Sequence, residues 1–74
     1  MTNIKQAITL RSNLTRQIIS RASKYGASGY DIDDAIDAIW FIIRLRTDVY
    51  TINTPADYDK ALGILNDILP EVSS

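Results

Sequence analysis

The sequence predicts an all-α fold, a bundle of three helices joined by short connections. The helices are expected at residues 3–25, 31–50 and 55–69. Each segment repeats its apolar residues with the helical period, and turn-forming residues at 26–29 and 52–55 separate the segments. The chain has 74 residues, of which 46% are hydrophobic and 23% charged, as in a small globular domain. Residues 1–74 therefore form one helical domain, with 70–74 as a short C-terminal tail.

The first predicted helix has one broad apolar face. Thr2 or Asn3 is a suitable N-cap, and Gly26 is a typical stop signal after the last turn. At 100° per residue, the apolar side chains gather on one side. They are Ile4, Ala7, Ile8, Leu10, Leu14, Ile18, Ile19, Ala22 and Tyr25.

The second predicted helix begins with acidic residues. We expect Asp31 to cap it, and Asp33 and Asp34 to lie near the positive end of the helix dipole. Its centre, residues 38–43, is six consecutive apolar residues, for which a β-strand is the competing interpretation. The capping pattern and the periodicity on both sides favour a helix.

The third predicted helix has the clearest start signal in the chain. Thr54 is in the N-cap position, Pro55 suits the first turn, and Asp57 can reach back to the main chain. Pro70 ends the helix, and Gly63 lies on its polar side.

The second helix is apolar around most of its circumference, more than two neighbouring helices can cover. We therefore expect a homodimer in which this helix packs against its symmetry mate. The predicted interface residues are Ile39, Trp40, Ile42, Ile43 and Arg46. The alternative is a single subunit whose own termini wrap the helix.

The charges are unevenly distributed along the chain. All five charged residues before residue 31 are basic, namely Lys5, Arg11, Arg16, Arg21 and Lys24. From residue 31 onward there are nine acidic residues and three basic ones, and the whole chain has a net charge of −1. One interpretation is that the charges compensate each other within the chain, because the first helix packs beside the acidic residues at 31–37. The other is that the five basic residues bind an external anion, such as a phosphate backbone, a nucleotide or an acidic protein surface.

Arg11 and Arg46 are predicted within apolar arcs of their helices. Burying an unpaired guanidinium is costly, so each must reach water or find a partner. We expect an ion pair with one of the aspartates, either within the chain or between two subunits. The alternative for Arg11 is a crevice that binds an anionic ligand.

Several kinds of chemistry are excluded by residue type. Cys and His are both absent, which excludes disulfides, thiolate zinc sites and histidine bases. The aspartates at 31–37 lack the glycine and glutamate of a calcium loop, so we expect no metal. No nucleophile lies beside a base, and we expect neither an enzyme nor a cofactor. The apolar runs are short and the first 25 residues contain charges throughout, unlike a secretory signal, so we expect a cytoplasmic protein without a membrane span.

The function expected from these features is non-catalytic. We expect a helical protein–protein interaction module that occupies a surface of a macromolecular partner, as small accessory or inhibitor proteins of phages and mobile elements do. The alternative is a protein that binds an anionic ligand, a nucleotide or a nucleic-acid phosphate, through the basic first helix.

Overall fold

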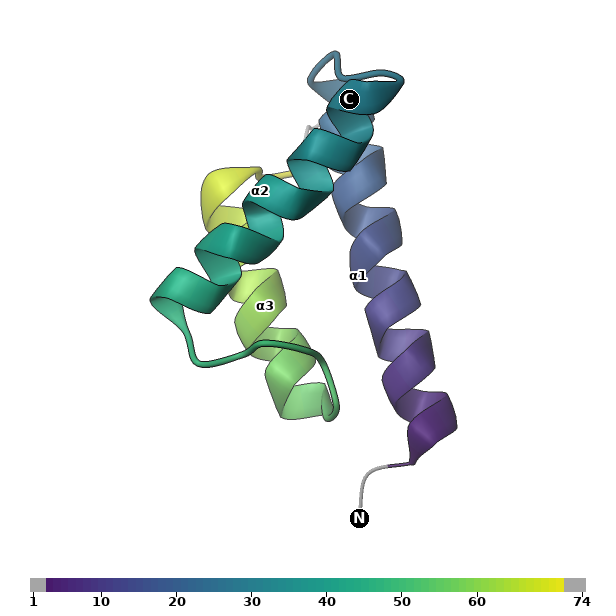
Figure 1. Cartoon of the computed structure of the whole chain (residues 1–74), viewed down its shortest axis with the longest axis vertical. Coiled ribbons are helices and arrows are strands. Elements are labelled where there is room, and N and C mark those ends of the chain that lie inside the picture. The colour runs from purple at the N-terminus through teal and green to yellow at the C-terminus, as the bar shows by residue number, and fades with distance from the viewer. Residues whose placement is uncertain (1–2, 72–74) are drawn as a thin grey trace.

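The computed structural model describes residues 3–71, which contain three packed helices and no strand (Figure 1). The helices are α1 (Ile4–Lys24), α2 (Tyr30–Arg46) and α3 (Pro55–Ile68). Each helix packs against the other two. The predicted all-α, three-helix fold is confirmed.

Both predicted end signals of α1 are confirmed. At the start, Oδ1 of Asn3 accepts a hydrogen bond from the main-chain nitrogen of Lys5 at 2.8 Å. At the end, Gly26 has φ of 101°, and the main-chain nitrogen of Ala27 donates to the oxygen of Ala22 at 3.0 Å. This pattern closes a helix with a residue in the left-handed region, which glycine adopts without a steric cost.

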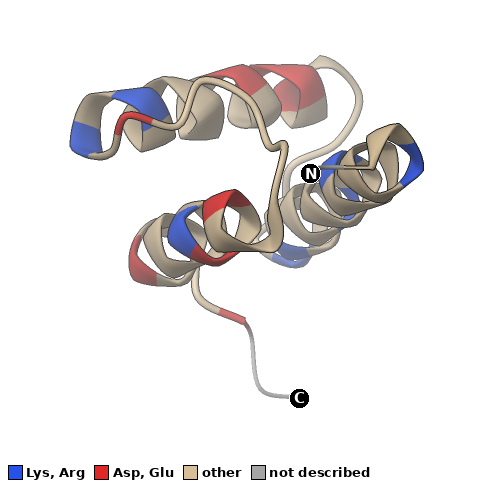
Figure 2. Ribbon diagram, turned by 90° about the horizontal axis from the view of Figure 1, so that it is seen from below, with Lys and Arg blue, Asp and Glu red and all other residues tan. Residues whose placement is uncertain are grey.

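The start of α2 differs from the prediction. Gly29, with φ of 58°, is the N-cap residue, and no side chain caps the helix. Asp31 is instead in the first turn together with Asp33, where both carboxylates face the positive end of the helix dipole. Figure 2 shows acidic residues at this end of α2 and basic residues at the other.

The end of α2 corrects a second prediction, because the helix stops at Arg46 rather than at residue 50. The hydroxyl of Thr47 donates to the main-chain oxygen of Ile43 at 2.7 Å and accepts from the nitrogen of Val49 at 3.2 Å. Such local bonds compete with helix continuation. The extended connection then places Val49 and Ile52 in the core, with 5% and 0% of their surface exposed.

The predicted start of α3 is confirmed. The hydroxyl of Thr54 accepts from the nitrogen of Asp57 at 3.2 Å, and the Asp57 carboxylate accepts from the nitrogen of Thr54 at 3.3 Å. This reciprocal capping box satisfies two main-chain donors. The helix ends before Pro70, as predicted. Of the predicted tail, residues 72–74 lie outside the described residues.

The core is built by all three helices and by the connection between α2 and α3. Its buried residues are Leu14, Ile18, Ile39, Ile43, Val49, Ile52, Ala61 and Leu65. Four residues of the apolar face predicted for α1 are exposed instead: Ile4, Ile8, Ile19 and Tyr25. The first turns of α1 extend away from α2, which leaves Ile4 76% and Ile8 54% exposed (Figure 1).

Candidate functional site

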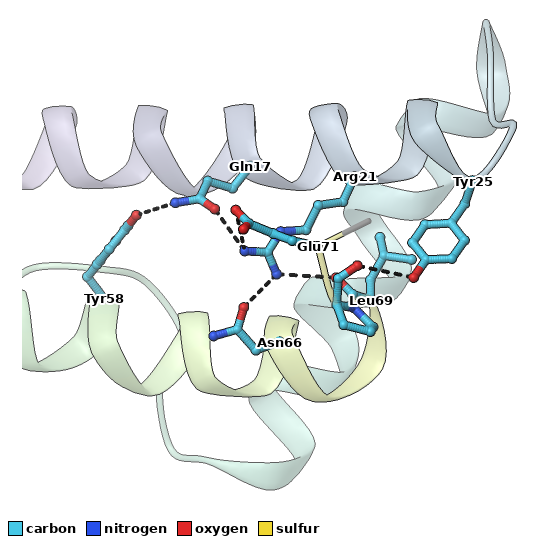
Figure 3. Close-up of polar contacts among 8 residues, drawn as sticks. Gln17, Arg21, Tyr25, Tyr58, Asn66, Leu69 and Glu71 are labelled. Carbon is cyan, nitrogen blue, oxygen red and sulfur yellow. Dashed lines mark hydrogen bonds and ion pairs between the residues drawn. The ribbon is translucent and has the colours of Figure 1, made fainter. Parts of the chain in front are cut away.

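Arg21 on α1 is buried, with 5% of its surface exposed, although it carries a full charge. Its Nη1 atom donates to Oδ1 of Asn66 at 2.7 Å and to the main-chain oxygen of Leu69 at 3.2 Å. Its Nη2 atom donates to Oε1 of Gln17 at 2.9 Å and lies 3.5 Å from the carboxylate of Glu71 (Figure 3). This guanidinium therefore joins α1 to the C-terminal end of α3.

Two further hydrogen bonds extend this network along α1 (Figure 3). Nε2 of Gln17 donates to the hydroxyl of Tyr58 at 3.1 Å, and the Tyr25 hydroxyl donates to the main-chain oxygen of Pro70 at 3.1 Å. The Nε atom of Arg21 is buried and has no hydrogen-bond acceptor within residues 3–71. Since buried donors are normally paired, this atom leaves the guanidinium incompletely satisfied.

A polar hollow of about 270 Å³ lies beside this network, and we call it the basic hollow. It is lined by Arg16, Gln17, Ser20, Arg21, Lys24 and Glu71. Three of the five predicted anion-binding residues, Arg16, Arg21 and Lys24, therefore come together. Lys5 and Arg11 do not line it and lie nearer the start of α1.

Arg11 lies at a separate place, against the connection between α2 and α3. Its Nε atom donates to the main-chain oxygen of Ile52 at 2.9 Å, and Nη2 donates to Oδ1 of Asn53 at 2.9 Å. The intramolecular ion pair with an aspartate predicted for Arg11 is not found within residues 3–71, where its partners are a carbonyl and an amide. It also borders a wide depression of about 420 Å³ with Ile4 and Ile8.

The predicted ion pair of Arg46 is confirmed, since its Nη1 atom lies 3.6 Å from the carboxylate of Asp67. Both side chains are more than half exposed, so the pair adds little stability. Over the part of the chain that the structure describes, no acidic residue at 31–37 lies within 4.0 Å of a basic group. Direct pairing of α1 with these acids, the internal interpretation of the charges, is therefore not observed.

The residues predicted for the dimer interface are divided between the core and the surface. Ile39 and Ile43 are covered within the single chain, with 6% and 0% of their surface exposed. Trp40 and Ile42 are half-buried, and the guanidinium of Arg44 lies 5.7 Å from the centre of the Trp40 ring.

The exposed side of α2, which we call the outer face, carries large apolar side chains among charged ones. Phe41 is 60% exposed and Leu45 is 70% exposed. These two residues are one helical turn apart and project from the same side. The outer face comprises Asp34, Asp37, Ala38, Phe41, Arg44 and Leu45.

An apolar groove of about 330 Å³ adjoins the outer face. Ala35, Ala38 and Ile42 of α2 line one side of it, and Ala38 is shared with the outer face. The remaining lining residues are Ala22, Tyr25, Ala27, Ile39, Ile68 and Leu69. Sequence reasoning missed this groove, because it forms only where the ends of α1 and α3 meet the alanines of α2.

Two further findings concern metals and membranes. Across residues 3–71, no three Asp or Glu side chains gather in a way suited to holding a metal ion. None of the three helices combines the length and the apolar character that crossing a membrane requires. Comparison of the chain with family models, with curated proteins and with solved structures finds no match.

Proposed function

We propose that this protein is a non-catalytic helical interaction module, and that a second copy of the chain binds at the outer face of α2. The observation that carries the proposal is the position of Phe41 and Leu45, 60% and 70% exposed, beside an open apolar groove. Exposed apolar patches of this kind are typical of sites where proteins associate.

The shape of the surface supports a partner that is itself helical. Phe41 and Leu45 form a ridge, while Ala35 and Ala38 leave a hollow beside it. Small side chains let a neighbouring helix approach closely, and large ones fill the space between two helices. The ridge and the hollow that can receive it therefore lie on the same helix. A two-fold interface requires this, because each copy presents the same surface to the other.

The charges on α2 favour a second copy in the antiparallel orientation. On the outer face, Asp34 and Asp37 lie towards the start of α2, and Arg44 lies towards its end. An antiparallel pair places the acidic end of each helix against the basic end of the other, whereas a parallel pair places like charges together. Such complementarity fixes orientation and speeds association more than it adds affinity.

Sedimentation equilibrium from micromolar to millimolar protein tests the proposal. The wild type is expected to approach twice its mass of 8.3 kDa. Phe41→Ser and Leu45→Ser should remain monomeric. Ile8→Ser is the matched control, because Ile8 is 54% exposed but lies on α1, and this variant should associate like the wild type. A wild-type protein of 8.3 kDa at every concentration would overturn the proposal.

A charge-exchange experiment tests the orientation. Asp37→Arg places an arginine in each half of the outer face, at positions 37 and 44, whereas Arg44→Asp leaves only aspartates as its charged residues. Each variant alone should dissociate, and an equimolar mixture should form a heterodimer because opposite charges meet at both ends. If each variant self-associates as the wild type does, the antiparallel arrangement is wrong.

A further inference from the structure

The basic hollow on α1 holds more positive charge than its own acidic residue compensates. Arg16, Arg21 and Lys24 contribute three positive charges, and Glu71 contributes one negative charge. Arg16 and Lys24 have no carboxylate within 4.0 Å in residues 3–71. The net excess in this concave site is therefore two positive charges, and a concave site concentrates the field of its charges.

The buried guanidinium of Arg21 gives the hollow a fixed wall. It is held at four points, by Asn66, Leu69, Gln17 and Glu71 (Figure 3). The first three partners are neutral oxygens, and its buried Nε atom has no acceptor in the described chain. The charge is thus positioned accurately but is only weakly neutralised.

The Glu71 carboxylate lines the hollow but forms only a weak ion pair with Arg21. It lies 3.5 Å from Nη2 of Arg21, while 76% of its side chain is exposed to solvent. Ion pairs this exposed contribute little, because water competes with the contact. The contact nevertheless shows that an oxyanion fits against this side of the guanidinium.

The other lining groups are donors suited to a phosphate. Arg16, Ser20 and Lys24 follow one another at intervals of four residues, so they form a row along α1. Guanidinium, ammonium and hydroxyl groups are those that proteins use to bind phosphate oxygens. Gln17 is occupied by Arg21 and Tyr58 and stiffens the site from one side.

We infer that the basic hollow is a binding site for a phosphate dianion, free or as a phosphate monoester, and that this ligand displaces the carboxylate of Glu71. The excess of two positive charges matches a dianion better than the single charge of a phosphate diester. Displacement follows because two anions in one small site repel each other. This inference is independent of self-association, since no residue of α2 lines the hollow.

Titration of isotope-labelled protein with inorganic phosphate, followed by amide chemical shifts, tests the inference. The pH should be about 8, above the second pKa of a phosphate monoester (about 6) and that of inorganic phosphate (about 7), so that both probes are dianions, and chloride should keep the ionic strength constant. Saturable shifts are expected at residues 16–24 and at Glu71. A parallel titration with glycerol phosphate distinguishes a monoester from the free ion, and acetate should bind much more weakly.

Matched variants separate the site from general charge attraction. Arg16→Gln and Lys24→Gln should each weaken phosphate binding about tenfold, as expected for one charge-assisted hydrogen bond. Lys5→Gln removes the same charge from the same helix outside the hollow, and should leave the affinity unchanged. Glu71→Gln should tighten binding severalfold, because it removes the competing carboxylate.

Three results would overturn the inference. Shifts that grow linearly with phosphate would show that there is no site. Equal losses in Lys5→Gln and Lys24→Gln would show attraction to the whole helix. Tighter binding of a single-stranded oligonucleotide than of phosphate, at equal salt, would replace the monoester site with a nucleic-acid surface.

Discussion

Arg21 of α1 and Asn66 of α3 are joined by a 2.7 Å hydrogen bond from Nη1 to Oδ1, although they lie 45 positions apart in the chain. The bond closes the bundle at the end where α1 and α3 both stop. Because the donor is charged and the side chain of Arg21 is buried, this contact contributes to folding more than a surface pair does.

The first prediction concerns the loss of this buried guanidinium. Arg21→Met should lower the free energy of unfolding by about 2 kcal/mol, since it removes the charged donor of three partly buried hydrogen bonds. Urea unfolding measures this change. Lys24→Met removes an exposed charge from the same part of α1 and should change stability by less than about 0.5 kcal/mol. Equal stabilities of the two variants would show that the Arg21 network is not structural.

The second prediction concerns Arg11 and the connection between α2 and α3. Arg11→Met removes the donors to the Ile52 carbonyl and to Asn53, both at 2.9 Å. Because the side chain is largely exposed, we expect a loss of only about 1 kcal/mol. Amide hydrogen exchange of residues 49–53 should accelerate in the variant, because the connection loses an anchor. Lys5→Met is the control and should leave these amides unchanged.

The third prediction is that replacing two glycines by alanine changes the stability of the protein in opposite directions. Gly26 has φ of 101°, a conformation that alanine adopts only with strain, so Gly26→Ala should destabilise the protein by about 1 kcal/mol. Gly63 is inside α3, and a Cβ there meets nothing within 4 Å. Gly63→Ala should therefore stabilise the protein by about 0.5–1 kcal/mol. Thermal unfolding of the two variants compares them directly, and a shift in the same direction would contradict the argument.

The sequence allowed the three helices to be predicted because their signals are local. The capping residues Asn3 and Thr54 and the stop at Gly26 act within a few positions of themselves. The end of α2 was predicted four residues too late, at 50 instead of 46. Apolar periodicity predicts that Val49 is buried, but it does not show whether Val49 belongs to the helix or to an extended connection that enters the core. The outcome depends on the space between the packed helices, which the local sequence does not reveal.

The candidate site was only partly predictable. The basic character of α1 is visible in the sequence, but which arginine is buried is not. Periodicity placed Arg11 in the apolar arc, whereas Arg21 is the buried one, because Asn66 and Leu69 supply acceptors from α3. On α2, the apolar run at 38–43 points in all directions, so only packing decides that Ile39 and Ile43 are inside while Phe41 is outside.

The last prediction uses this division of α2 to separate folding from association. Ile43 is 0% exposed, and Ile43→Ala should lower the free energy of unfolding by about 3 kcal/mol at every protein concentration. Phe41 is 60% exposed, so Phe41→Ala should leave the stability of the monomer nearly unchanged. If the outer face of α2 binds a second copy, the melting temperature of the wild type should rise with protein concentration, and Phe41→Ala should abolish this rise. The two variants thus remove apolar surface from one helix with different consequences. A loss of monomer stability in Phe41→Ala as large as that in Ile43→Ala would show that Phe41 belongs to the core of a single chain and would leave the outer face without its principal contact.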